Sequence, residues 1–191
     1  MNIELTIEPR IIAALKHIAS KDECRPVLTG ISLRCLEGKA TFTATNGQAL
    51  ASIQADISIP ENLDVILPVR VPHRLNRIAI NDDSGKITYF EPGQDITLKL
   101  IEGKYPNFLS VIPEQTTEAK HAPFGVHHLE EIMACAKAYA KRTKLNDDAG
   151  LYCLPQGKGP SIFALGGYPE WFAMLMPRTG EPTIPNWLKK K

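Results

Sequence analysis

The chain has 191 residues, of which 43% are hydrophobic and 23% charged, with 22 Lys and Arg against 21 Asp and Glu and a net charge of +1. This composition excludes a disordered or fibrous protein and a protein that is basic throughout. No run approaches the roughly 18 apolar residues of a membrane span, and the start of the chain, Ile3 to Ile7, alternates polar and apolar residues unlike a signal peptide. We therefore expect a cytoplasmic protein.

The four cysteines, Cys24, Cys35, Cys135 and Cys153, lie far apart in the sequence. They form no C-x-x-C pair, and no histidine is placed to complete a zinc site with them. We predict buried, reduced thiols, no metal site and no cofactor.

The first predicted elements are an alternating strand at Ile3 to Ile7 and a helix that begins at Pro9 and runs to about Ser20. Apolar residues recur on one face of this helix with helical spacing. Three strands follow, at Ile31 to Leu36, Ala40 to Thr45 and Leu50 to Ile57, separated by the turn sequences Glu37-Gly38 and Asn46-Gly47.

The same order of elements returns twice. The second pass predicts a strand, a helix and two strands at Leu63 to Leu67, Val69 to Ile80, Lys86 to Phe90 and Asp95 to Ile101. The third predicts a strand, a helix and three strands at Lys120 to Phe124, His127 to Arg142, Leu151 to Leu154, Ser161 to Leu165 and Trp171 to Met176. The helices begin about sixty residues apart, which indicates a structural repeat.

A strand-helix-strand unit of this kind cannot cover its own sheet, so units are expected to pair around a shared core. The proline-bearing stretch Pro106 to Lys120 is the best linker. We predict an α+β fold with helices on one face of antiparallel sheets. Its parts are a complete two-unit domain at 1–115, with units at about 1–60 and 61–115, a half domain at 116–178 and a tail at 179–191. A half domain needs a partner, so we expect an oligomer.

The near-neutral total hides a segregation of charge. The segments that hold the three predicted helices, residues 9–21, 69–80 and 127–144, contain ten basic and two acidic residues, a net charge of +8, and the rest of the chain carries −7. Basic side chains recur on the faces opposite the apolar residues. One such stripe is usually a solvated face, but three with few interleaved acids indicate a polyanion, most simply the backbone of duplex DNA. The candidate DNA-binding residues are Arg10, Lys16, His17, Lys21, Arg70, His73, Arg74, Arg77, Lys137, Lys141 and Lys144.

Several segments carry a resemblance to a known family. They are Arg25-Pro26-Val27-Leu28-Thr29-Gly30-Ile31, Ala44-Thr45-Asn46-Gly47-Gln48-Ala49-Leu50-Ala51, Ile66-Leu67-Pro68, Leu100-Ile101-Glu102-Gly103-Lys104-Tyr105-Pro106-Asn107-Phe108 and Val111-Ile112-Pro113. In this order and spacing they resemble the middle domain of the bacterial DNA polymerase III beta subunit, the sliding clamp. The stretch from Phe124 to Leu175-Met176-Pro177-Arg178 resembles the last half of the final clamp domain.

The resemblance implies the DNA-clamp fold, in which twelve strand-helix-strand units form a ring and basic helices surround duplex DNA without reading its sequence. It implies a polymerase processivity factor that is not an enzyme and that has DNA polymerase and a clamp loader as partners. Clamp rings are built from two chains of six units or three chains of four. Three units per chain therefore predict a homo-oligomer of four chains, a tetrameric ring.

The resemblance also implies a pocket for partner peptides between the middle and last domains. The residues at matching positions are Leu28, Thr45, Gly47, Leu50, Pro106, Val111, Met174, Leu175, Met176 and Pro177. The chain departs from the family pattern at Asn46, Gln48, Ala49 and Arg178, which leaves its peptide preference open. The alternative is that these residues only pack the junction between domains.

Other functions remain open on the sequence. A truncated clamp relative would recruit or sequester replication partners without encircling DNA, and a structural oligomer would bind nothing through its basic stripes. An enzyme is disfavoured, because the glycine turns lack phosphate-loop spacing and the adjacent His127 and His128 lack the spacing of a zinc pair. The end of the chain, Pro185 to Lys191, is expected either to dock as a self-ligand or to form a free tail.

Overall fold

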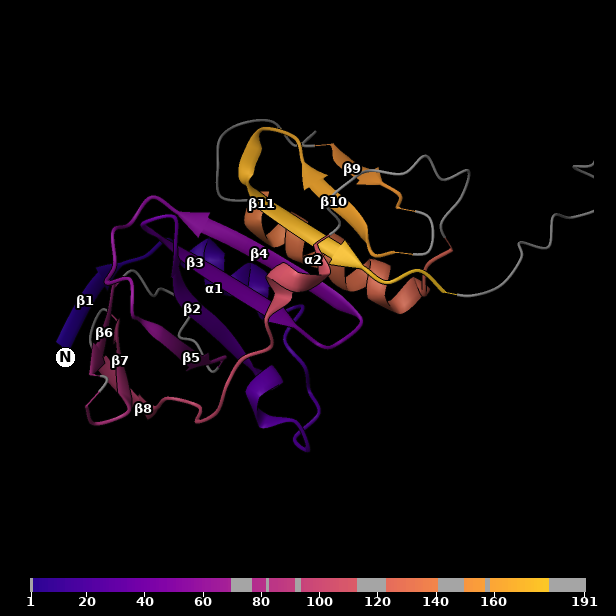
Figure 1. Cartoon of the computed structure of the whole chain (residues 1–191). Helices are drawn as coiled ribbons and strands as arrows, with labels where there is room; N and C mark the ends of the chain where they lie inside the picture. Colours follow the sequence, from indigo (N-terminus) through magenta and orange to yellow (C-terminus); the bar gives the residue numbers. More distant parts are fainter. Residues whose placement is uncertain are drawn as a thin grey trace, which may run out of the picture.

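The computed structural model describes residues 2–69, 77–81, 83–91, 94–112, 123–140, 150–156 and 159–178. In these residues two α-helices lie against one face of a seven-stranded antiparallel sheet, and four further strands form a second antiparallel sheet (Figure 1). This arrangement confirms the predicted α+β class. No helix in the described part of the chain has the length and apolar character needed to cross a membrane.

The first unit follows the predicted order of elements. It contains β1 (Asn2–Thr6), α1 (Pro9–Leu15), the short 3-10 helix η1 (Pro26–Thr29), β2 (Gly30–Leu36), β3 (Lys39–Thr45) and β4 (Ala49–Ala55). Helix α1 begins with Pro9 in its first turn, as expected, but ends five residues before Ser20. The chain tightens there, because the amides of His17 and Ile18 bond to carbonyls only three residues back, those of Ala14 and Leu15.

The second unit contains β5 (Asp64–Pro68), β6 (Arg77–Asn81), β7 (Lys86–Glu91) and β8 (Gln94–Lys99). The predicted helix from Val69 to Ile80 is wrong over its last four residues, which belong to strand β6. Ile78 and Ile80 are fully buried while Arg77 is exposed, so the side chains alternate with the period of a strand. Val69, the predicted first residue of the helix, is in a bend, and residues 70–76 lie outside the described residues.

The third unit contains α2 (Val126–Ala140), β9 (Leu151–Leu154), β10 (Ser161–Leu165) and β11 (Tyr168–Leu175). Pro123 and Phe124 are not in a strand, contrary to the prediction for Lys120 to Phe124, whose first three residues lie outside the described ranges. Instead, Phe124 packs against Phe163 of β10, with ring centres 5.5 Å apart.

The sheets join the units in two ways. The first two units exchange their first strands, because β1 pairs with β6 and β5 pairs with β2. The third unit continues the sheet of the first, since β11 pairs with β4 in the order β5-β2-β3-β4-β11-β10-β9 (Figure 1). The predicted division at 115/116 and the tail at 179–191 lie outside the described residues.

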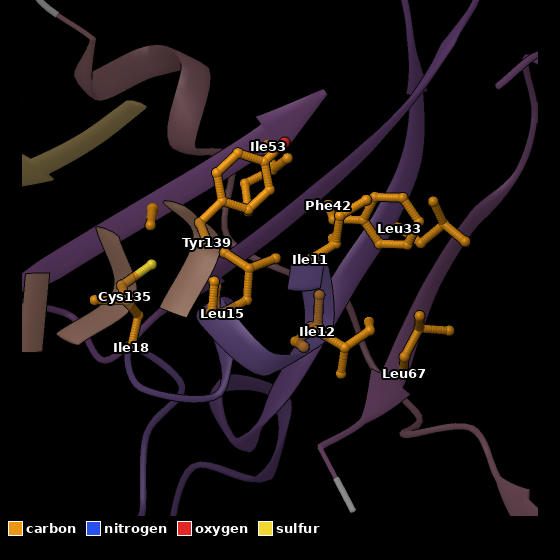
Figure 2. Close-up of a cluster of buried hydrophobic side chains, with 14 of the residues drawn as sticks. Ile11, Ile12, Leu15, Ile18, Leu33, Phe42, Ile53, Leu67, Cys135 and Tyr139 are labelled. Atoms are coloured by element: carbon orange, nitrogen blue, oxygen red, sulfur yellow. The ribbon is translucent and has the colours of Figure 1, made fainter. Parts of the chain in front are cut away.

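One apolar core connects the first and third units. Ile11, Ile12, Leu15 and Ile18 belong to one cluster with residues of the sheet and with Cys135 and Tyr139 of α2 (Figure 2). Helices α1 and α2 lie side by side on the sheet. The third unit is therefore held by a shared core as well as by the pairing of β11 with β4.

The four cysteines are free thiols in different environments. Cys135 is fully buried, and burial raises the pKa of its thiol to about 12. The prediction of buried thiols is wrong for Cys24 and Cys153, which are exposed, and Cys35 is only half-buried. Cys24 lies in the loop after α1, and Cys153 lies in β9, an end strand of its sheet, where packing covers less of the side chain.

Candidate functional site

Exposed basic side chains lie on the layer formed by α1 and α2, which we call the helix layer. Lys16, His17 and Lys21 are exposed in the segment that follows α1, and Lys137 is exposed on the neighbouring helix α2. We call Lys16, Lys21 and Lys137 the helix-side lysines. Because α1 and α2 pack together on one face of the sheet, the helix-side lysines belong to the same layer of the molecule.

The pKa of His17 reports the positive potential at the end of α1. Partial burial of the ring lowers this pKa, and the charges of Lys16 and Lys21 lower it further. The negative charge of a phosphate group placed here would oppose the effect of the two lysine charges on this pKa. Arg70, His73, Arg74, Lys141 and Lys144, the other candidates of this kind, lie outside the described residues.

Arg10 does not belong to a solvent-facing stripe, which corrects the sequence prediction. Its side chain is only 11% exposed and bonds to Glu8. The guanidinium lies 4.4 Å from the ring centre of Tyr139 and 5.8 Å from that of Tyr168. Arg10 thus borders a cavity of about 550 Å³ between α1, β4 and the third unit. Its role is to join α1 to the third unit, a tertiary contact that helical spacing within α1 cannot indicate.

Arg77 also departs from the predicted stripe. It lies in strand β6, where its guanidinium stacks 4.2 Å from the ring centre of Phe90 and approaches Glu4 of β1 at 4.0 Å. A helical face shared with Arg70 and Arg74 is therefore wrong for this residue. The i, i+4, i+7 spacing crosses the start of a strand and carries no geometric meaning there.

A second apolar cluster lies on the sheet face opposite the helices. Leu50 of β4 and Met174 of β11 are directly opposite each other, and the short 3-10 helix η2 (Phe108–Val111) covers them with Phe108. Their neighbours Ala51 and Ala173 point to the main core, because successive strand residues face opposite ways. Around the cluster, Leu109 is 39% exposed, Val111 52% and Met176 45%. We call these six residues, Leu50, Phe108, Leu109, Val111, Met174 and Met176, the outer apolar surface.

The structure brings only some of the predicted pocket residues to this surface. Leu50, Val111, Met174 and Met176 belong to it, and Thr45 pairs directly with Leu50. Leu175 is wrong as a pocket residue, because it is 1% exposed in the main core. Leu28 is buried within η1, Pro106 and Gly47 are exposed, and Pro177 is half-buried. The sequence prediction missed Phe108 and Leu109, although both belong to or adjoin the segment Leu100 to Phe108 that carries the resemblance.

The turn between β3 and β4 ties this region to α2. The Asn46 side-chain oxygen accepts hydrogen bonds from the amides of Gln48 and Ala49, at 2.9 and 2.8 Å. Its Nδ2 donates to Oε2 of Glu131 at 2.8 Å. Gly47 adopts a φ of 93°, which favours glycine. Asparagine supplies both an acceptor and a donor here, so its side chain fits a carboxylate on the neighbouring helix.

Replacing the side-chain amide of Asn46 by a carboxylate should destabilise the protein. We expect Asn46→Asp to lower the free energy of unfolding by about 1–3 kcal/mol at pH 7, because the donor to Glu131 is lost and two carboxylates then face each other. The loss should shrink as the pH falls toward 4, where protonation of either carboxyl restores a donor. Urea denaturation at both pH values measures this, with Asn107→Asp in an exposed loop position as the matched control. An equal effect of the two substitutions at pH 7 would contradict the assigned role.

Comparisons with known proteins identify one family over the first part of the chain. The family model of the DNA polymerase III beta subunit, central domain, matches residues 4–107. The beta sliding clamp of Chlamydia muridarum is 30% identical over an alignment of 130 residues that covers 63% of this chain and 34% of that protein. The beta sliding clamp of Staphylococcus aureus is 27% identical over an alignment of 123 residues that covers 60% of this chain and 33% of that protein. The chain thus matches about one third of the length of these curated relatives.

Solved structures share the fold over nearly the whole chain. The DNA polymerase III subunit beta from Borrelia burgdorferi, in complex with a natural product, has a TM-score of 0.72 at 12% identity and covers 94% of this chain and 64% of its own. A sliding clamp from Bartonella birtlesii bound to griselimycin has a TM-score of 0.73 at 14% identity, with coverage of 94% and 66%. The match to the family model spans more than half of the sequence, and the fold is that of the solved clamp structures. This chain therefore belongs to the DNA polymerase III beta subunit family of sliding clamps.

Proposed function

We propose that this protein is a DNA sliding clamp that assembles into a ring of four chains around duplex DNA and tethers a DNA polymerase or repair partner, with a clamp loader to place it on DNA. It acts by holding on to DNA and has no catalytic role. One observation carries the proposal: α1 and α2, with the helix-side lysines, form one layer, and a sheet that continues from the first to the third unit forms the other. This arrangement places the helix-side lysines on one side of the molecule and the sheet on the other.

The recognition of DNA in this proposal is independent of sequence. The helix-side lysines provide flexible cations for phosphates, which position a protein on DNA without reading bases. The mass in solution at micromolar concentration, with and without DNA, tests the assembly. Four chains of 21.1 kDa each are expected, and a stable monomer or dimer under both conditions would contradict the ring.

A second candidate function rests on the outer apolar surface. Leu109, Val111 and Met176 expose apolar area beside the buried pair Leu50 and Met174, which suits a short peptide with apolar anchors. Through this surface the chain would recruit or sequester replication partners without encircling DNA. Peptide capture at the outer apolar surface fits either function, because this surface and the helix layer lie on opposite faces of the sheet.

A charge in the outer apolar surface should abolish peptide capture. We expect Met176→Arg to reduce binding of a bacterial clamp-binding peptide, one with a glutamine and apolar anchors, by at least tenfold, because a cation would be desolvated beneath the peptide. Leu50→Arg should have the same effect where the variant remains folded. Tyr152→Arg is the matched control, since Tyr152 is 62% exposed on β9. Pull-down of all three variants at equal amounts of peptide measures the effect, and equal capture by Met176→Arg and wild type would exclude this surface.

A further inference from the structure

The outer apolar surface is assembled from three separate segments of the chain. Strand β4 contributes Leu50, β11 and the residue directly after it contribute Met174 and Met176, and η2 contributes the other three residues. A short peptide can contact all of them together only while the three segments keep their relative positions. A surface that is already ordered loses less conformational freedom on binding, so a contact that fixes these segments strengthens peptide capture.

The turn between β3 and β4, residues 45–49, joins all three segments, and we call it the hub turn. The amide of Thr45 donates a hydrogen bond to the hydroxyl oxygen of Tyr105 at 2.9 Å, three residues before Phe108. The carbonyl of Gln48 accepts a hydrogen bond from the amide of Met176 at 3.1 Å. Strand β4 begins at the last residue of the hub turn. The positions of Met176 and η2 relative to β4 therefore depend on the hub turn.

Asn46 shapes the hub turn from within and anchors it to helix α2. Its side-chain oxygen accepts hydrogen bonds from two amides of the turn, and its Nδ2 donates to Oε2 of Glu131 at 2.8 Å. Two neighbours on α2 also hold this carboxylate, with Nδ1 of His128 3.1 Å from Oε2 and Nε2 of His127 3.3 Å from Oε1. The Glu131 side chain is only 19% exposed. Glu131 thus offers Asn46 an acceptor in a fixed position.

The segment that carries Met176 is held from its other side by the approach to α2. The amide of Arg178 donates to the carbonyl of Pro123 at 2.7 Å, three residues before α2 begins. Met176 therefore lies between a contact with the hub turn and a contact with the chain that leads into α2. The bond between Asn46 and Glu131 joins two side chains, so substitution can remove it without changing the backbone.

We propose that Glu131 is a positioning residue for peptide capture: through Asn46 it fixes the hub turn, and the hub turn holds Met176 and η2 in the outer apolar surface. The inference rests on the proposed capture of partner peptides by this surface. Glu131 does not line the surface, because α2 lies against the opposite face of the sheet. A residue of the helix layer therefore determines how tightly the opposite face binds.

Removing the Glu131 carboxylate should weaken peptide binding although this residue does not touch the peptide. We expect Glu131→Ala to lower the affinity for a bacterial clamp-binding peptide about fivefold, the effect of one lost hydrogen bond. Glu130→Ala is the matched control, since it removes the same charge from the preceding, exposed residue of α2 and should leave the affinity unchanged. Fluorescence anisotropy of the labelled peptide measures both, at a temperature where urea denaturation shows each variant folded. Equal affinities for Glu131→Ala and wild type would overturn the proposal.

A reversal of donor and acceptor identifies the bond itself as the cause. Asn46→Asp alone should weaken peptide binding, because the donor to Glu131 is lost. Adding Glu131→Gln should restore the affinity to within about twofold of wild type, because the glutamine nitrogen then donates to the new carboxylate, which still accepts from the amides of the hub turn. A double variant that binds as weakly as Asn46→Asp would contradict the proposal. The same comparison decides the matter if Glu131→Ala does not fold.

Hydrogen exchange tests the positioning without any peptide. In Glu131→Ala the amide of Met176 should exchange about tenfold faster, because the hub turn that accepts its hydrogen bond opens more often. Amides that pair β7 with β8 in the other sheet should keep their rates. An unchanged rate at Met176 would rule out the positioning role. If wild type binds no peptide, the proposed capture fails, while faster exchange at Met176 still supports the positioning by Glu131.

Discussion

Replacing Trp171 by alanine should lower the free energy of unfolding by about 3–5 kcal/mol, the range for removing a large aromatic side chain from a core. Trp171 is 1% exposed and lies opposite Ile53, where β11 joins the sheet of the first unit. Its removal would leave a cavity between the two units that the surrounding strands cannot fill. Urea denaturation at a fixed chain concentration measures the loss, because the assembly contributes to the apparent stability.

Tyr152→Ala provides the matched control for this prediction. Tyr152 is also aromatic and belongs to the same sheet, but it is 62% exposed. Its removal should change the free energy of unfolding by less than about 0.5 kcal/mol. Similar losses for the two variants would contradict the conclusion that one core unites the first and third units.

Removing the charges of the helix-side lysines should weaken DNA binding and its dependence on salt. Each phosphate contact contributes about 0.9 to the slope of log affinity against log salt concentration, so replacing Lys16, Lys21 and Lys137 by glutamine should reduce this slope by about 3. The loss should be the same on duplexes of different sequence, since these side chains contact phosphates. Fluorescence anisotropy over a series of salt concentrations measures both properties.

The control for the helix-side lysines removes equal charge from the sheets. Lys39, Lys86 and Lys99 are exposed on β3, β7 and β8. Their replacement by glutamine lowers the net charge by the same amount and should leave the slope nearly unchanged. If the slope of log affinity against log salt concentration fell equally in both triple variants, DNA binding would depend on net charge alone. The helix-side lysines would then not form the DNA-binding site.

Much of the fold could be predicted because its strongest signals are local. The strands around Glu37-Gly38 and Asn46-Gly47 alternate clearly and are separated by good turn residues, and the structure places β2, β3 and β4 there. Helix α2 was also predictable, since its apolar residues recur over four turns. The resemblance correctly indicated the family, because it depended on several segments in order and not on one motif.

The errors arise where tertiary contacts outweigh local spacing. The segment Arg77-Ile78-Ala79-Ile80 satisfies a helical and an alternating pattern, and pairing with both β1 and β7 makes it a strand. Arg10 has the spacing of an exposed residue, but Tyr139 from the third unit covers it. The bond between Asn46 and Glu131 joins residues 85 apart in sequence, so no local pattern indicates it. The predicted basic stripe on α1 could therefore be corrected only once the packing of α1 against α2 was known.

The central claim is that this protein surrounds duplex DNA, and retention on circular against linear DNA tests it most directly. Protein bound to a nicked circular duplex should remain bound through a wash at high salt, where phosphate contacts alone are weak. Cutting the circle should release it, because a ring slides off a free end, and blocking both ends with a bulky protein should restore retention. Equal retention on circular and open linear DNA of the same length, or loss from both in high salt, would contradict the account.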